Sequence, residues 1–331
     1  MRDLWLEFGI ALAVSFLLTV VLTHFIIPIL KGKKVKQHIL VVGPKWHQAK
    51  EGTPTMGGIG FIMAILAVLL GMTVWYAIRG NQAQLIPLAL TMALAVMNGL
   101  IGFVDDFCKL MKKQNEGLKA YQKFTLQVLA ALIYVVLLKV LGHIDTALHI
   151  PFTDRAVELG FIYYVFAVFT IVGMVNSVNL TDGIDGLAGT VTLVVFAFFG
   201  FVGLSMLHVS LSLLSAVLIG GMFGFLVYNL HPAKVFMGDT GSLFLGGVVT
   251  GAAFLIDEPM IVFIVGGMYV LESVSVILQV GSFKLRNKRI FKMAPIHHHF
   301  EKCGWKEGKI VTVFGLVTAA LCVLAWFGIG L

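Results

Sequence analysis

Charged residues are scarce in this sequence of 331 residues. They make up 12% of the chain, whereas soluble globular proteins carry about 25%. Hydrophobic residues reach 59% and the mean hydropathy is +0.95. This balance excludes an ordinary soluble domain and predicts an integral membrane protein. The apolar runs approach or exceed the roughly 20 residues that a helix needs to cross a bilayer, so they favour an all-α bundle over a barrel of short alternating strands.

Cysteine is also scarce, and its use argues against disulfides. Cys108, Cys303 and Cys322 make an odd count, and two of them fall in loops that we expect in the cytoplasm, where thiols stay reduced. The sequence also lacks internal repeats, low-complexity tracts and a separate soluble domain, so we expect one polytopic domain over residues 1–331. The first apolar run is long and lacks a small-residue cleavage site, so we do not interpret it as a removable signal.

Hydropathy along the chain predicts ten membrane spans. They lie near residues 4–30, 56–78, 85–104, 124–141, 159–181, 187–206, 209–230, 241–256, 259–281 and 310–330. The loops on one side of this arrangement hold 20 of the 24 lysines and arginines. Positively charged loops stay in the cytoplasm, so we expect both termini outside the cytoplasm. The net charge of +7 is then explained by the topology and by an attraction of the basic loops to anionic lipid or phosphate. We expect no nucleic-acid partner.

The polar motifs gather on the predicted cytoplasmic face, beginning with Asp105 and Asp106 at the end of the third span. Carboxylates near hydrocarbon are costly, and the negative end of a helix dipole adds to the cost, so this pair needs a cation. Lys109, four residues on, neutralises them if they are only a solvated helix end. Alternatively they hold Mg²⁺ or handle a phosphate, because hard oxygen ligands suit that ion.

Two glycine-flanked turns, "NLTDGIDGLAG" and "FMGDTGS", place Asp182, Asp185 and Asp239 before the sixth and eighth spans. Aspartates in such turns often only cap helices, yet helix N-termini of this kind also bind anions. Asparagines stand nearby at span ends: Asn176, Asn179 and Asn229. Two turns of this type on one face favour a phosphate and metal pocket.

Other polar residues on this face have two interpretations each. Lys50 and Thr55 in "KEGTPTMGG" are either solvated or phosphate donors, and Phe236 is either a core aromatic or a plate for a nucleobase. His297 and His298 belong to a run of three histidines, which cannot easily surround one ion because neighbouring helical side chains point about 100° apart. We therefore exclude zinc and expect either phosphate-binding imidazoles or a polar loop.

Two pairs of small residues stand one helical turn apart. Gly220 with Gly224 and Gly247 with Gly251 permit close helix packing within the chain, or form the face of a homodimer.

Five motifs, in order, resemble the polyprenyl-phosphate sugar-phosphate transferases. They are "TPTMGG", "GFVDDF", "NSVNLTDGIDGLAG", "YNLHPAKVFMGDTGSL" and "MAPIHHHFE". The last two favour the branch with a muramoyl-pentapeptide donor over relatives that use simpler UDP-N-acetylhexosamines. The resemblance implies transfer of phospho-MurNAc-pentapeptide from its UDP carrier to undecaprenyl phosphate, with Mg²⁺, in the bacterial cytoplasmic membrane. It gives the first lipid intermediate of peptidoglycan and releases UMP.

The resemblance also implies roles for individual residues. Asp105, Asp106, Asp239 and His297 are expected in catalysis, with Asp239 as the metal ligand and Asp105 and Asp106 as further candidates. The expected substrate-binding residues are Lys50, Thr55, Lys109, Lys123, Asn176, Asn179, Asp182, Asp185, Asn229, Phe236, Gln279 and His298. A transporter is the rival interpretation, but carriers need polar groups near the membrane midplane and usually show repeats.

Overall fold

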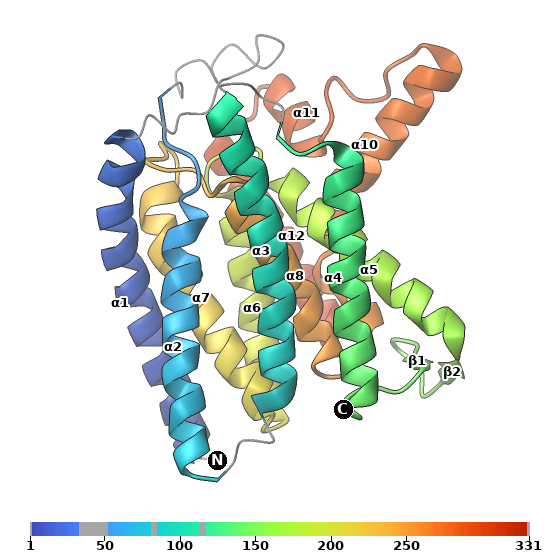
Figure 1. Ribbon diagram of the computed structural model, residues 1–331. Helices are drawn as coiled ribbons and strands as arrows, with labels where there is room; N and C mark the ends of the chain where they lie inside the picture. The colour runs from blue at the N-terminus through green and yellow to red at the C-terminus, as the bar shows by residue number, and fades with distance from the viewer. Residues whose placement is uncertain (1, 33–51, 81–84, 113–116, 330–331) are drawn as a thin grey trace.

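The computed structural model describes residues 2–32, 52–80, 85–112 and 117–329. These residues form a helical bundle with one small hairpin (Figure 1). The long helices are α1 (Arg2–Gly32), α2 (Gly58–Ile78), α3 (Ile86–Lys112), α4 (Ala120–Val140), α5 (Phe161–Thr181), α6 (Leu187–Ser205), α7 (Val209–Asn229), α8 (Gly238–Phe254), α10 (Gly267–Arg286) and α12 (Glu307–Trp326). The short elements are β1 (Ala147–His149), β2 (Ala156–Glu158), η3 (Pro259–Ile261), α9 (Val262–Val265) and α11 (Ile296–Lys302).

Nine helices of the described part are long and apolar enough to cross a membrane. They coincide with nine of the ten predicted spans. The remaining predicted span, 241–256, is α8, a helix of 17 residues. At 1.5 Å per residue, α8 is about 25 Å long, somewhat shorter than a typical hydrocarbon core. The described residues therefore confirm an all-helical membrane protein.

Helix α8 occupies the centre of the bundle, with α3 and α5 as its main neighbours (Figure 1). Its residues from Thr240 to Phe254 are all buried. Glycines make this packing possible: a Cβ on Gly246 would lie 2.5 Å from Val175 Cα of α5, and one on Gly247 would lie 2.9 Å from Ala95 Cα of α3. The central helix therefore fixes the positions of α3 and α5 relative to each other.

Both glycine pairs pack inside the chain. Gly220 and Gly224 lie against the backbone of α1, and Gly251 lies against Thr91 of α3 in the same way as Gly247 against Ala95. The first of the two interpretations, close packing within the chain, is confirmed for these pairs, and their burial removes them as a dimer face.

Two of the predicted spans differ from the helices in the structure, one in its end and one in its continuity. The third span does not end at residue 104, because α3 continues to Lys112 and contains Asp105 and Asp106 within its helical part. The ninth span is not one helix, since the chain passes through η3 and α9, breaks at Gly266 and restarts as α10. Between α4 and α5 the chain forms a small antiparallel hairpin of β1 and β2. Both ends of the described chain lie at the hairpin end of the bundle, opposite α11 (Figure 1).

Candidate active site

Asp106 connects α3 to the start of α8. Its carboxylate accepts hydrogen bonds from the backbone N–H groups of Asp239 (3.2 Å) and Thr240 (2.9 Å) and from Thr240 Oγ1 (2.7 Å). An anion at a helix N-terminus satisfies N–H groups that lack partners in the helix and interacts favourably with the helix dipole. The side chain of Asp106 therefore caps α8 from a neighbouring helix and fixes the position of Asp239.

Asp105 is buried one residue earlier on α3 and has two partners. Its Oδ2 lies 2.7 Å from Lys109 Nζ, and its Oδ1 accepts a hydrogen bond of 2.7 Å from the backbone N–H of Leu118. A Cβ on Gly117 would lie 2.4 Å from Oδ1, so the loop approaches this carboxylate closely only because residue 117 is glycine.

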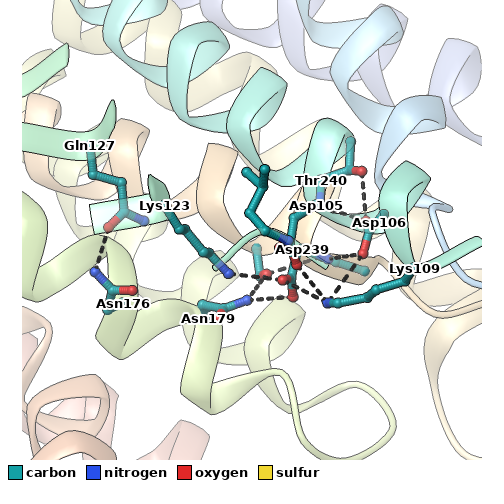
Figure 2. A network of polar contacts seen from close by, with 12 residues as sticks. Asp105, Asp106, Lys109, Lys123, Gln127, Asn176, Asn179, Asp239 and Thr240 are labelled. Atoms are coloured by element: carbon teal, nitrogen blue, oxygen red, sulfur yellow. Dashed lines mark hydrogen bonds and ion pairs between the residues drawn. The ribbon is translucent and has the colours of Figure 1, made fainter. Parts of the chain in front are cut away.

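Asp239 lies between two lysines (Figure 2). Its Oδ2 is 3.0 Å from Lys109 Nζ and 2.8 Å from Lys123 Nζ, while its Oδ1 accepts a hydrogen bond of 2.9 Å from Asn179 Nδ2. Asn179 also donates to Ser242 Oγ at 2.8 Å. The predicted residues Asp105, Asp106, Lys109, Lys123, Asn179 and Asp239 thus meet at one point, although they come from α3, α4, α5 and α8.

The three carboxylates at this point could hold a divalent cation. Asp105, Asp106 and Asp239 each offer an oxygen, and these oxygens lie within 4.8 Å of one another. All three donors are hard oxygen ligands, the type that Mg²⁺ and Ca²⁺ prefer. Two lysine charges oppose three carboxylate charges, which leaves an excess of negative charge for a cation to neutralise.

Asp182 adds a fourth acidic group near this cluster. It follows α5 directly and is half-buried. Burial raises the pKa of Asp182 well above its usual range, and the negative charges of Asp239, Asp106 and Asp185 raise it further. The environment of Asp182 therefore favours its neutral form.

Beside the cluster, an apolar groove of about 790 Å³ runs between α4 and α5. It extends from Phe161 at the start of α5 to Asn176 near its end, and Phe124 and Val128 line it from α4. Asn176 donates a hydrogen bond of 2.8 Å to Gln127 Oε1, one helical turn from Lys123. Asn176, which lines one end of the groove, therefore lies next to the charged cluster (Figure 2).

Asp185 belongs to a second polar cluster rather than to the carboxylate cluster. Its Oδ2 lies 3.1 Å from His231 Nδ1 and accepts a hydrogen bond of 3.0 Å from the backbone N–H of Ala233. Glu307 Oε2 accepts a hydrogen bond from the backbone N–H of Asp185 at 3.2 Å and lies 3.6 Å from His231 Nδ1. This cluster joins the α5–α6 turn to the segment before α8 and to α12.

Asn229 strengthens the same junction. It accepts a hydrogen bond from the backbone N–H of Gly186 at 3.1 Å and donates one to Val235 O at 2.9 Å. Phe236 pairs through its backbone with residues before α2, donating to Pro54 O at 2.9 Å and accepting from Gly57 N at 2.8 Å. Thr55 Oγ1 lies beside this backbone pairing, close to Gly238, whose φ is +72°.

The three histidines point to three different partners, as expected for neighbouring residues of the short helix α11. His297 is buried against Glu272 of α10, with Nδ1 at 3.1 Å from Oε1. His298 Nδ1 lies 2.6 Å from Glu301 Oε2. His299 Nδ1 accepts a hydrogen bond from the backbone N–H of Lys292 at 3.1 Å. The run therefore occupies a folded helix rather than a polar loop.

Two predicted site residues lie away from these clusters or outside the description. The amide of Gln279 bonds to the backbone of Ile290 and Phe291, three hydrogen bonds of 3.0 Å, and so holds the segment after α10 against that helix. Lys50 lies outside the described residues.

Residues of the clusters that the sequence did not single out share one property, namely that their partners are distant in the chain. They are Gln127, His231, Glu272 and Glu307. Glu301 was also not singled out, although its partner, His298, is only three residues away. His231 stands in the motif "YNLHPAKVFMGDTGSL", and Glu272 and Gln279 are polar residues within an apolar span. The sequence therefore offered a reason to consider each of these three residues. Glu307 gave none, because nothing near it in the sequence marks its contact with Asp185.

Comparison with known proteins gives a consistent result. The sequence model of glycosyl transferase family 4 matches residues 87–257. A protein of Alkaliphilus metalliredigens is 46% identical over 322 residues, which cover 94% of this chain and 95% of the relative. A protein of Staphylococcus carnosus is 42% identical (96% and 98% covered), and one of Geobacillus thermodenitrificans is 41% identical (95% and 95%). Each of these three relatives is named phospho-N-acetylmuramoyl-pentapeptide-transferase.

Proposed function

This chain belongs to the family of the phospho-N-acetylmuramoyl-pentapeptide-transferases, and we propose that it carries out the reaction for which that family is named. It transfers phospho-MurNAc-pentapeptide from UDP-MurNAc-pentapeptide to undecaprenyl phosphate. The products are UMP and the first lipid intermediate of peptidoglycan synthesis. The observation that carries this proposal is the identity of 41–46% over almost the full chain. Location in the bacterial cytoplasmic membrane, with the site on the cytoplasmic face and both termini on the other, is part of the proposal.

The carboxylate and lysine cluster supports a phosphoryl transfer. Both substrates are polyanions, and the reaction moves negative charge onto the departing UMP. Lys109 and Lys123, both within 3.0 Å of Asp239 in this structure, are placed to pair with phosphate oxygens of the donor. A divalent ion held by Asp105, Asp106 and Asp239, which we propose to be Mg²⁺, would supply further electrostatic stabilisation of the phosphates.

Asp106 has a supporting role in this assignment, because its oxygens accept three hydrogen bonds from the start of α8. It holds Asp239 in position. Asp105 has one oxygen engaged with a backbone N–H and the other with Lys109, so it is the carboxylate better placed to release its lysine to a substrate phosphate.

The groove between α4 and α5 supports a lipid acceptor. It is lined by aliphatic and aromatic side chains, has a volume of about 790 Å³ and ends at Asn176. A polyprenyl chain lying along it would bring its phosphate to Lys123 and Asp239. We assign the opposite side of the cluster, with Asp182, Asn229 and Phe236, to the nucleotide donor.

The test is release of UMP by the purified protein with UDP-MurNAc-pentapeptide and undecaprenyl phosphate. Parallel reactions contain Mg²⁺ or EDTA, and UDP-GlcNAc is the competing donor. We expect turnover with the muramoyl donor and the metal only. Turnover with UDP-GlcNAc would move the chain to a sister branch, and no product with either donor from a folded sample would refute the proposal.

A further inference from the structure

Glu272 is a carboxylate buried inside a helix that is apolar enough to span the membrane. It lies on α10 with none of its surface exposed, and His297 of α11 is equally buried against it. An ionisable side chain in such a place is costly, so it is retained in general where it pairs with another group that has a function. Glu272 lies outside the carboxylate cluster, so binding a metal there does not account for it.

The carboxylate contacts His297 in two ways. Glu272 Oε1 lies 3.1 Å from the ring nitrogen Nδ1, and Oε2 accepts a hydrogen bond of 3.4 Å from the backbone N–H of the same residue. One side chain therefore fixes both the start of α11 and the orientation of the imidazole ring. A carboxylate this close to the ring restricts how the ring can turn.

The other ring nitrogen faces the α5–α6 turn. A Cβ on Gly183 would lie 2.2 Å from His297 Nε2 and 2.6 Å from Cε1, so the ring occupies the space that glycine leaves. Gly183 directly follows Asp182, which stands next to the carboxylate cluster. Within the described residues, both ring nitrogens of His297 and Glu272 Oε1 are buried without a hydrogen bond of good geometry, so Glu272 Oε1 is close to Nδ1 without bonding to it and Nε2 has no partner at all. A buried imidazole nitrogen without a partner is costly, and its position beside the candidate site points to a partner on the substrate.

We propose that Glu272 is a positioning residue that holds the start of α11 and the His297 ring, so that Nε2 faces the α5–α6 turn, where it contacts the diphosphate of the donor. This inference rests on the proposed function. The titratable groups in contact with the ring are Glu272 from α10 and His298 of α11, whose ring centroid is 4.1 Å away. On the side of Nε2 the ring packs against Gly183, the residue after Asp182.

A matched pair at the opposite end of the bundle provides a control. Glu258, after α8, lies 3.4 Å from His149 Nδ1 of β1. This contact has the same chemistry as Glu272 and His297 but no connection to the carboxylate cluster. Glu258→Gln should therefore leave turnover and both KM values unchanged.

The test is a double-mutant cycle with Glu272→Gln, His297→Gln and the variant that carries both changes. Glu272→Gln keeps the shape of the side chain and removes its charge. We expect it to lower kcat at least about 10-fold, as loss of a carboxylate behind a functional histidine does, with little change in the KM for undecaprenyl phosphate. If Glu272 acts through His297, adding Glu272→Gln to His297→Gln causes no further loss.

Two outcomes overturn the inference: wild-type kcat in Glu272→Gln, or losses that multiply in the double variant. If Glu272→Gln alone does not fold, comparing His297→Gln with the double variant still shows whether Glu272 contributes to turnover when the imidazole is absent. Melting temperatures of all variants in detergent identify any loss due to unfolding.

A second readout separates this inference from the proposed function. The ¹⁵N chemical shifts of histidine-labelled protein report where the ring proton resides, and the His297 signal is assigned from its loss in His297→Gln. We expect the ring shifts of His297 to change in Glu272→Gln, even if the wild type is inactive with the muramoyl donor. An unchanged shift refutes the pairing, whereas wild-type inactivity refutes only the proposed function.

Discussion

The tight contact between α3 and α8 at Gly102 makes a sharp prediction. A Cβ at this position would lie 2.1 Å from Asp239 O and 2.7 Å from Thr240 N, both backbone atoms at the start of α8. Ordinary contacts of a Cβ begin near 3.4 Å. Backbone atoms within a helix cannot move aside singly, so Gly102→Ala must separate the two helices by about 1 Å.

That separation acts directly on the site. The hydrogen bonds from α8 to Asp106 are 2.7–3.2 Å long, and an added 1 Å takes them beyond useful length. Each bond to a charged acceptor contributes about 1.5–3 kcal/mol, and a misplacement of about 1 Å can cost about 100-fold in rate. We expect Gly102→Ala to reduce UMP release about 100-fold and to lower the melting temperature.

Two alanine variants serve as controls. On the same helix one turn earlier, a Cβ on Gly99 would come nearest to the Phe244 side chain, at 3.2 Å, and a side chain can shift slightly. A Cβ on Gly71 of α2 would meet no neighbouring atom within 4 Å. Gly99→Ala should lose activity only modestly and Gly71→Ala not at all. If Gly102→Ala retains more than about half of the wild-type rate, the close approach does not determine the site geometry.

Single residues give three further predictions. Asp239→Asn should abolish turnover in a folded protein, as EDTA should in the wild type with recovery on adding Mg²⁺; normal metal-dependent turnover in Asp239→Asn contradicts the assignment. Asn229→Ala removes the partners of Gly186 N–H and Val235 O, so it should destabilise the protein by about 1–3 kcal/mol, measured as a lower melting temperature. Burial raises the pKa of Asp257 to about 6, above the usual value of about 4. The fold therefore favours its protonated form, and stability should rise as pH falls from about 6 to about 4; Asp257→Asn should remove that part of the pH dependence of the melting temperature.

Much of the fold was predictable because hydropathy is a local signal. A helix that crosses hydrocarbon needs a continuous apolar run, and all ten predicted spans correspond to helical segments of the described chain. The errors came where the apolar run and the helix do not have the same ends. Helix α3 continues past the end of its apolar run, and Gly266 interrupts the helix although the sequence stays apolar. Whether the lysine-rich side faces the cytoplasm stays a prediction.

The residues that gather at the site were mostly predictable too, as polar groups at span ends, but their contacts were not. The sequence offered Asp106 as a metal or phosphate residue, and the fold uses it first to cap a helix that begins 132 positions later, at Gly238. The histidine run predicted phosphate-binding imidazoles or a polar loop, and in the structure α11 directs the three rings to separate partners.

The sequence by itself determined the class of the protein, its spans and the motifs that mark its family, because each depends on residues close together in the chain. Only the tertiary structure decided which carboxylate faces which cation. Asp239 meets Lys109 and Lys123 across 130 and 116 positions, and Glu272 meets His297 across 25. The pairs of Asp239 depend on how closely α3, α4 and α5 approach the start of α8, and the pair of Glu272 depends on how closely α11 approaches α10. No local pattern of residues encodes these distances between helices.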